Sequence, residues 1–158
     1  MTSRRYPALL VFLLVTFAAA AIGSSATFPN VSTWYPTLNK PSWTPPGWLF
    51  GPVWTCLYIA MAVAAWRVWR KSMIGNAAVT AWLYGLQLVL NALWSVLFFG
   101  LKQPGFALVN IFALWLLLLG LLVRFWRADR IAGALWTPYF LWVTFASGLN
   151  TAIWWLNR

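Results

Sequence analysis

Five long apolar runs constrain this chain more than any other feature of its sequence. The runs span residues 7–27, 48–69, 77–99, 106–123 and 134–156. Each is close to the length of about 20 mainly apolar residues that a helix needs to cross the hydrocarbon core of a bilayer. The chain is 63% hydrophobic and only 8% charged, whereas soluble domains have about 25% charged residues. The sequence therefore predicts an all-α protein, an integral membrane bundle of five transmembrane helices in one domain, residues 1–158.

The connections between the runs differ in length and composition. Three are short, residues 70–76, 100–105 and 124–133, which predicts that consecutive helices pack antiparallel. The first connection, residues 28–47, is long and rich in proline and tryptophan. Because proline fixes φ and removes a hydrogen-bond donor, we expect a stiff loop that acts as a lid over a pocket.

The charge of the chain is strongly positive, with eleven Lys and Arg against one acid. A soluble protein of this charge would suggest a nucleic-acid partner. Here the basic residues lie at the ends of apolar runs, so we expect contact with the lipid bilayer and no nucleic acid. Eight lie on the side of the N-terminus, namely Arg4, Arg5, Arg67, Arg70, Lys71, Arg124, Arg127 and Arg130, and three lie opposite, namely Lys40, Lys102 and Arg158. The positive-inside rule then places the N-terminus in the cytoplasm and the C-terminus outside.

The first run also fits a second interpretation. Arg4 and Arg5, the apolar stretch and the sequence Ser24-Ser25-Ala26 together are typical of a signal peptide with its cleavage site. Cleavage would leave four helices. The run is longer than the apolar part of a usual signal peptide, which favours a retained first helix.

Polar residues within the apolar runs are costly in lipid, so we expect them to face the interior of the bundle. Gln87, Asn91 and Ser95 share one face of the third run, and Asn110 and Asn150 lie in the fourth and fifth. They could form hydrogen bonds between helices or provide the polar lining of a ligand pocket.

The third run carries a stripe of small residues, Ala77, Ala81 and Gly85. The stripe lies roughly 80° around the helix from the polar face. Small residues let helix backbones approach closely. The stripe is a candidate homodimer interface, with packing inside one chain as the alternative.

Fourteen tryptophans are more than anchoring at the membrane surface requires. Trp54 and Tyr58 lie one turn apart, and Trp142, Ala146 and Asn150 share a face of the last run. Large flat rings with few polar groups suit a large flat ligand. Composition leaves open the alternative that the rings fill their own core.

Four motifs are spread over nearly the whole chain. They are Trp34-Tyr35-x-x-Leu38-Asn39-Lys40-Pro41-Ser42-Trp43-Thr44-Pro45-Pro46-x-Trp48, Gly51-Pro52-Val53-Trp54-Thr55-x-Leu57-Tyr58, Asn91-x-Leu93-Trp94-Ser95-x-x-Phe98-Phe99-Gly100 and Pro138-Tyr139-x-x-Trp142-x-x-Phe145-Ala146-x-x-Leu149-Asn150. With these motifs the sequence resembles the TspO/MBR family, the tryptophan-rich sensory proteins and translocator proteins.

The resemblance implies a five-helix bundle, often a homodimer, with the first loop folded over a pocket. Members of that family bind porphyrins such as protoporphyrin IX and haem, and benzodiazepine-type ligands, and some promote light-dependent porphyrin breakdown. It therefore implies a membrane receptor or regulator that binds tetrapyrroles, with a porphyrin transporter as the alternative. The pocket residues by this likeness are Trp34, Tyr35, Trp43, Trp54, Tyr58, Asn91, Trp142, Phe145, Ala146 and Asn150.

Conventional catalytic groups are scarce. The chain has no histidine, one acid, Asp129, and one cysteine, Cys56, so it has no catalytic triad, no carboxylate pair and no metal cluster. We expect no metal site and no obligatory cofactor, with porphyrin or haem as a ligand. Whether the protein is an enzyme stays open. Any catalysis would use a photoexcited porphyrin and oxygen, with Trp54 and Trp142 as candidate electron donors.

Lys40 could meet porphyrin propionates at the pocket mouth or be a plain surface lysine.

Overall fold

The computed structural model describes residues 5–72 and 74–158, and over these ranges its regular structure is entirely helical. The elements are α1 (Arg5–Val31), the short 3₁₀ turn η1 (Tyr35–Thr37), α2 (Gly47–Lys71), α3 (Ile74–Ser95), the π-helical turn η2 (Val96–Gly100), α4 (Pro104–Ala128) and α5 (Arg130–Leu156). The five predicted helices are thereby confirmed. Arg4, used above in the charge count, lies outside the described residues.

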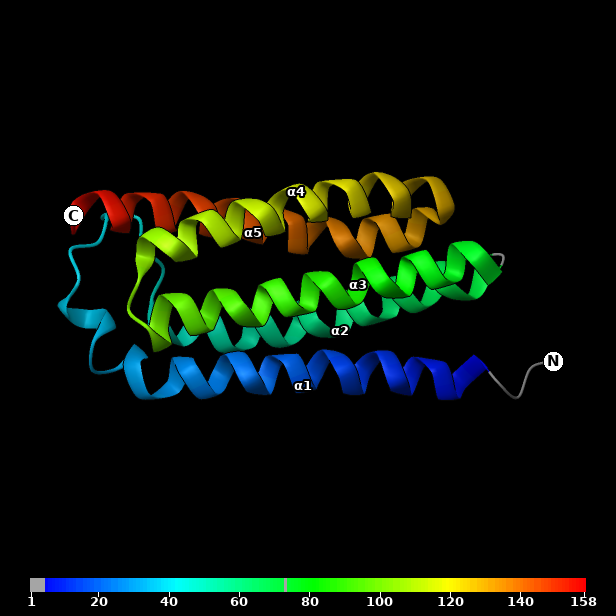
Figure 1. Ribbon diagram of the computed structural model, residues 1–158, viewed down its shortest axis with the longest axis horizontal. Helices are drawn as coiled ribbons and strands as arrows, with labels where there is room; N and C mark the ends of the chain where they lie inside the picture. The colour runs from blue at the N-terminus through cyan, green and yellow to red at the C-terminus, as the bar shows by residue number, and fades with distance from the viewer. Residues whose placement is uncertain (1–4, 73) are drawn as a thin grey trace.

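All five helices have the length that a membrane span requires. α1, α2, α4 and the α3–η2 unit are also apolar enough to cross a membrane by composition. α5 has 27 residues, as many as α1, and it lies alongside α4 (Figure 1). α5 is not among the four spans identified by composition because it carries Trp, Tyr and Thr side chains, which hydropathy scales score as less apolar than aliphatic ones.

The helices form a closed ring rather than following chain order around the bundle. α1 packs on α2 and α3, α2 packs on α5, and α4 packs on both α3 and α5. The order around the ring is therefore α1, α2, α5, α4, α3. Figure 1 shows the first connection and the C-terminus together at one end of the bundle, with the N-terminus at the other.

Every helix begins before its apolar run, and α1, α2 and α4 also end beyond theirs, whereas α3 ends at Ser95 and passes into η2; this corrects the predicted bounds. α1 continues through Pro29 to Val31, which shortens the first connection to residues 32–46. α5 begins at Arg130 because the Asp129 carboxylate accepts hydrogen bonds from the backbone N–H groups of Ile131 (2.9 Å) and Ala132 (3.4 Å). Hydropathy detects the part of a helix inside lipid, whereas caps decide where the helix ends.

The turn between α4 and α5 is tight because a glycine faces a ring. A Cβ added to Gly133 would lie 2.5 Å from the indole of Trp126. No side chain fits at this distance, so only glycine lets the first turn of α5 lie against the last turn of α4.

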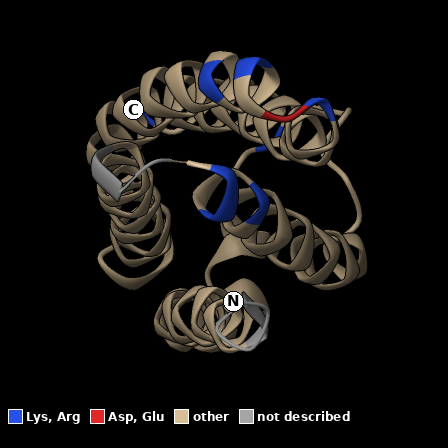
Figure 2. Ribbon diagram, turned by 90° about the vertical axis from the view of Figure 1, so that its right-hand side faces the viewer, with Lys and Arg blue, Asp and Glu red and all other residues tan. Residues whose placement is uncertain are grey.

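Asp129 also joins this turn to the end of α2. Its carboxylate lies 3.0 Å from the Arg67 guanidinium and 2.9 Å from the Lys71 ammonium. Burial tends to raise the pKa of Asp129, but the hydrogen bond from Lys71, the two backbone N–H groups and the charge of Arg67 outweigh it, so its pKa lies below the ordinary value. Figure 2 views this end of the bundle and shows the single acidic segment beside clustered basic residues.

The two halves of the bundle are packed differently. The half that includes the C-terminal part of α2 holds a continuous core with fully buried Met61, Leu118, Phe125 and Trp136. A smaller cluster, with Tyr35, Phe98, Phe99 and Ile153, lies in the half near the first connection. This second half contains the cavity described next.

Candidate functional site: an aromatic cavity

A cavity of about 460 Å³ lies in the half of the bundle near the first connection. Its wall comes from α1, α2, the end of α3 with η2, α5 and Tyr35 of the first connection. Sites for small molecules and cofactors commonly have volumes of about 300–1,000 Å³. The cavity is therefore large enough for a ligand of that class.

Two helices supply one aromatic side of the cavity. On α2, the rings of Trp54 and Tyr58 stack with centroids 5.3 Å apart and planes at 28°. On α5, Trp142 lies 6.5 Å from Trp54 at 87° and 5.7 Å from Phe145. The one-turn spacing of Trp54 and Tyr58 puts both rings on one face, so flat and edge-on ring surfaces are both available to a ligand.

The end of α3 supplies a second aromatic side. Trp94 stacks on Phe98 with centroids 5.2 Å apart and planes at 25°. Beyond Ser95 the helix widens into the π turn η2, closed by a hydrogen bond from Leu101 N–H to the Val96 carbonyl (2.8 Å). This turn brings the neighbouring residues Phe98 and Phe99 both into buried positions on the cavity wall. Such π turns often occur at functional sites.

Asn150 fixes the distance between α5 and the rest of the cavity. Its side-chain carbonyl accepts from the Trp94 indole N–H (2.9 Å), and its amide donates to the Pro104 carbonyl (2.9 Å). Both polar ends of this buried amide are satisfied, so Asn150 positions α5 relative to α3 and α4.

A chain of hydrogen bonds lies beneath the aromatic side. The Tyr58 hydroxyl donates to Asn91 (3.1 Å), Asn91 donates to the Tyr139 hydroxyl (3.0 Å), and Tyr139 donates to Gln87 (2.9 Å). The polar residues Gln87, Asn91, Asn110 and Asn150 are buried, in agreement with the expected inward orientation. This chain fixes the position of the Tyr58 ring at the cavity.

The structure brings seven of the ten predicted pocket residues together on the cavity wall. They are Tyr35, Trp54, Tyr58, Trp142, Phe145, Ala146 and Asn150. Their contact with a ligand stays a prediction.

Three predicted pocket residues lie behind the wall instead. Trp34 packs edge-on against Phe98 (5.8 Å), and Trp43 packs edge-on against Phe145 (5.7 Å). Asn91 uses both ends of its amide on Tyr58 and Tyr139. These three residues therefore support wall residues and do not themselves line the cavity.

The predicted pocket residues include none from α1 and none of the small residues on α2. Phe17, Ala21 and Phe28 line the cavity from α1, and Gly47, Gly51 and Thr55 line it from α2. The first apolar run, residues 7–27, lies before the first motif, which begins at Trp34. No motif therefore indicated that this run is part of the site. Gly51 and Thr55 stand in the second motif, one turn apart with Gly47 before them, and this spacing could have indicated one shared face.

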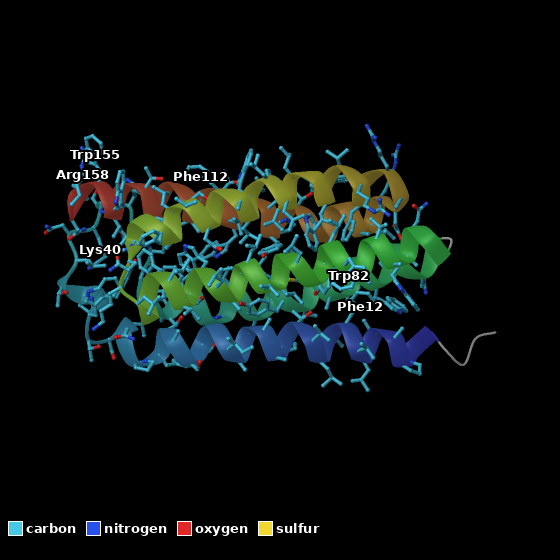
Figure 3. All side chains as sticks on the ribbon, in the orientation of Figure 1. Phe12, Lys40, Trp82, Phe112, Trp155 and Arg158 are labelled. Carbon is cyan, nitrogen blue, oxygen red and sulfur yellow. The ribbon has the colours of Figure 1, made fainter. Side chains whose placement is uncertain are left out.

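Lys40 differs in the structure from both interpretations given above, a contact with propionates and a plain surface lysine. Its ammonium group donates to three backbone carbonyls of the first connection, those of Tyr35 (2.8 Å), Leu38 (2.9 Å) and Pro36 (3.2 Å). It also lies 5.0 Å from the centre of the Tyr35 ring. Figure 3 shows Lys40 at the end of the bundle that also carries Arg158. Lys40 therefore holds the loop in shape and has no proton left for a propionate in this conformation.

Groups that could ligate an iron within a bound macrocycle are few. Cys56 is exposed and does not line the cavity, so the phenols of Tyr35 and Tyr58 are the side chains of the wall that could ligate iron. Burial raises the pKa of Tyr35, which favours the neutral phenol over the phenolate that binds iron.

Comparison with known proteins gives this geometry a context. The family model described as TspO/MBR family matches residues 11–156. The chain belongs to the TspO/MBR family. Among its relatives, the tryptophan-rich protein TspO of Chlorobaculum tepidum is 42% identical over 89% of each chain. Protein CrtK of Rhodobacter capsulatus is 37% identical over 94% of each chain.

The human translocator protein is 35% identical, covering 90% of this chain and 86% of its own length. The similarity of this TspO/MBR protein to its relatives thus extends across bacteria and animals. Family membership and the apolar helices identify it as an integral membrane protein.

The candidate dimer stripe of this TspO/MBR protein lies away from the cavity. Ala81 is exposed, Ala77 and Gly85 are partly exposed, and a Cβ added to Gly85 would meet no atom within 4 Å. The neighbouring Trp82 is 81% exposed (Figure 3). Close packing inside this chain therefore does not use Gly85, and the homodimer stays a prediction.

Proposed function

We propose that this protein is a membrane receptor or regulator that binds tetrapyrroles in the aromatic cavity, with protoporphyrin IX as the ligand to test first. One observation carries the proposal: the rings of Trp54, Trp142 and Phe98, from three separate helices, converge on one cavity. Flat aromatic surfaces stack on a flat macrocycle and bury its apolar faces. A benzodiazepine-type ligand fits the same chemistry, and haem fits it less well because the wall has no histidine or cysteine.

Binding is tested by adding protoporphyrin IX to the purified protein and measuring the quenching of tryptophan fluorescence. We expect saturable quenching with one porphyrin per chain, because several tryptophans lie at one cavity. The matched control is an equal amount of protein unfolded in denaturing detergent, which retains all fourteen tryptophans. Quenching that rises without saturation, equally in both samples, would contradict the proposal.

We propose a second, light-dependent activity at the same cavity. The excited porphyrin would take one electron from Trp54 or Trp142 and pass it to dioxygen, which becomes superoxide. The tryptophan radical cation would then take an electron from the porphyrin, and the porphyrin radical cation and superoxide would combine. Both oxygen atoms thus end in the opened macrocycle, the tryptophan is restored, and the protein holds the reactants together. Trp54 lies 6.5 Å from Trp142, so the two rings can exchange an electron. Trp142→Phe keeps an aromatic ring but removes the indole, and we expect it to slow the bleaching of bound protoporphyrin under light. Equal bleaching rates at equal occupancy would remove Trp142 from the mechanism.

The alternative function is transport of porphyrins across the membrane. It has less support, because the other half of the bundle is filled by the core around Met61, Leu118 and Trp136. Uptake of protoporphyrin into sealed vesicles separates the two: a transporter accumulates it in the lumen over time, and a receptor binds a fixed amount.

The proposed orientation follows from the charges. The end of the bundle with Arg67, Lys71 and Arg127 would face the cytoplasm, and the first connection and C-terminus would face outward. An alkaline phosphatase fused after Arg158 is active only outside the cytoplasm, so an inactive but intact fusion would contradict this orientation.

A further inference from the structure

The cavity is not equally closed on all sides. Of its lining residues, only six are exposed, and all six lie on two helices: Phe17, Ala21 and Phe28 on α1, and Gly47, Gly51 and Thr55 on α2. Every lining residue from α3, η2, α5 and the first connection is buried or half-buried. The cavity therefore opens sideways, through a slot between α1 and α2.

The side of the cavity between α1 and α3 is closed by close packing. A Cβ added to Gly23 of α1 would lie 3.2 Å from the Ser95 hydroxyl oxygen, and one added to Gly100 of η2 would lie 3.4 Å from the Ala26 Cβ. At the other end of α1, Phe12 packs on Trp69 of α2 (6.2 Å) and on Tyr84 of α3 (5.4 Å). α1 thus packs on α2 near the N-terminal end, and at the edge of the cavity its Phe17 ring also contacts Tyr58 of α2 (6.3 Å), so the slot runs from Phe17 towards Phe28.

The aqueous end is closed by the first connection. Tyr35 is buried and packs on Phe98 and Phe99. The loop is tied to the end of α5, where Asn39 N–H donates to the Asn157 side chain (2.9 Å) and the Asn157 amide donates to the Asn39 carbonyl (2.9 Å). A ligand that came from the water would have to break these bonds first.

On α2, the edge of the slot carries small residues with open space around them. A Cβ added to Gly47 or Gly51 would meet no atom within 4 Å, and the Thr55 hydroxyl is bonded to the Gly51 carbonyl (3.0 Å). Neither glycine has a positive φ, so backbone conformation does not require glycine there. What the two glycines provide is open space.

The slot faces lipid rather than water. Most exposed residues along this part of α1 are apolar, with Phe17 41%, Ile22 57% and Phe28 74% exposed. The hydroxyl of the exposed Ser25 donates to the Ile22 carbonyl (2.7 Å), and α1 and α2 are both long apolar spans. A flat apolar molecule dissolved among acyl chains would meet the slot edge-on.

We propose that the slot between α1 and α2, bordered by Gly47, Gly51 and Thr55, is the entrance through which a planar apolar ligand passes from the bilayer into the cavity. This inference rests on the proposed tetrapyrrole-binding function. The ligand enters from the half of the bilayer nearest the first connection, while the loop stays tied to α5.

The test compares binding rates in lipid vesicles with protoporphyrin IX already dissolved in the bilayer. Gly51→Leu places a side chain in the slot, and it should lower both the association and dissociation rates by about ten-fold or more, because it narrows the path into and out of the cavity. Gly120→Leu is the matched control, since Gly120 is an exposed helical glycine with equal open space on α4. It should leave both rates unchanged.

A second variant tests the aqueous end. Asn157→Ala removes both side-chain hydrogen bonds to Asn39 and should leave the two rates unchanged. Unchanged rates in Gly51→Leu, or faster association in Asn157→Ala, would overturn the proposed route. A raised Kd in Gly51→Leu with unaltered association would also overturn it, because residue 51 would then act on the bound ligand and not on its path.

The route can also be tested without porphyrin. In a Cys56→Ser background, Ala146→Cys places a thiol on the cavity wall, and we expect bilayer-soluble N-ethylmaleimide to label it faster than a sulfonated, water-bound thiol reagent does. Adding Gly51→Leu should slow the first reaction, and adding Gly120→Leu should not. If Gly51→Leu slows labelling but the wild-type protein does not bind protoporphyrin, the proposed function is wrong and the entrance stands. If Gly51→Leu does not slow labelling, the proposed entrance is wrong.

Discussion

At the scale of residues, the site combines rings that a ligand can stack on with one small side chain that leaves room for it. Ala146 lies on the cavity wall one turn from both Trp142 and Asn150. Asn150 is fixed by its bonds to Trp94 and Pro104, so α5 cannot move outward freely. Space at residue 146 is therefore set by the side chain that stands there.

Ala146→Thr should weaken protoporphyrin binding by about ten-fold, which corresponds to about 1.4 kcal/mol, because added atoms in a packed site cost about 1–3 kcal/mol. Fluorescence quenching gives the Kd. Ala134→Thr is the matched control: it makes the same change on the same helix at an exposed position, and its Kd should equal that of wild type. Equal affinities in the two variants would show that residue 146 does not limit the site.

Much of the site at this scale could be predicted from the sequence, because helical spacing decides which residues share a face. Trp54 with Tyr58, and Trp142 with Ala146, follow directly from that rule. Trp34 and Trp43 could not be placed in the same way. They belong to an irregular connection whose path depends on contacts with Phe98 and Phe145, and spacing along the chain carries no information about those contacts.

At the scale of elements, hydropathy found each helix but not its ends or its irregularities. The π turn η2 has no simple sequence mark, although it places Phe98 and Phe99 on the wall. The start of α5 depends on Asp129, the only acid in the chain, which caps that helix and pairs with α2. This one carboxylate joins three helices at the end of the bundle opposite the cavity.

Asp129 should make the stability of the protein depend on pH in acid. Its pKa in the folded protein is lower than the ordinary value of 3.8, so its contribution is fully present above that pH and is lost as pH falls through the folded pKa. The apparent melting temperature of the wild type should be constant from about pH 7 to pH 5 and should fall below about pH 4.

The comparison variant is Asp129→Asn, which retains a good N-cap but loses the charge. We expect it to melt several degrees lower at neutral pH, as for a loss of about 1–2 kcal/mol in the free energy of unfolding. Its melting temperature should then change little between about pH 5 and pH 3. A variant that melts like the wild type at every pH would show that the ion pairs with Arg67 and Lys71 contribute nothing.

At the scale of the whole molecule, the order of helices around the ring brings the site together. α2 lies beside α5 rather than only beside its chain neighbours, and this arrangement brings Trp54 next to Trp142. The sequence predicted antiparallel neighbours from short connections but could not predict the ring order, because that order depends on how whole faces fit. For the same reason the part played by α1 in the cavity was not foreseen.

The exposed stripe on α3 belongs to this scale as well. If two copies meet there, Ala81→Cys in a Cys56→Ser background should form a disulfide-linked dimer in membranes under mild oxidation. Ala113→Cys on α4, also exposed, is the control and should give monomer. Equal amounts of cross-linked dimer from both positions, or none from Ala81→Cys, would count against the interface.

The structure of the protein with protoporphyrin IX bound tests the central claim most directly. We predict the macrocycle inside the cavity, with its ring within about 4 Å of Trp54, Trp142 and Ala146. A macrocycle bound on the lipid-facing surface between α4 and α5, beside Phe112 and Trp115, with the cavity unchanged, would contradict the account.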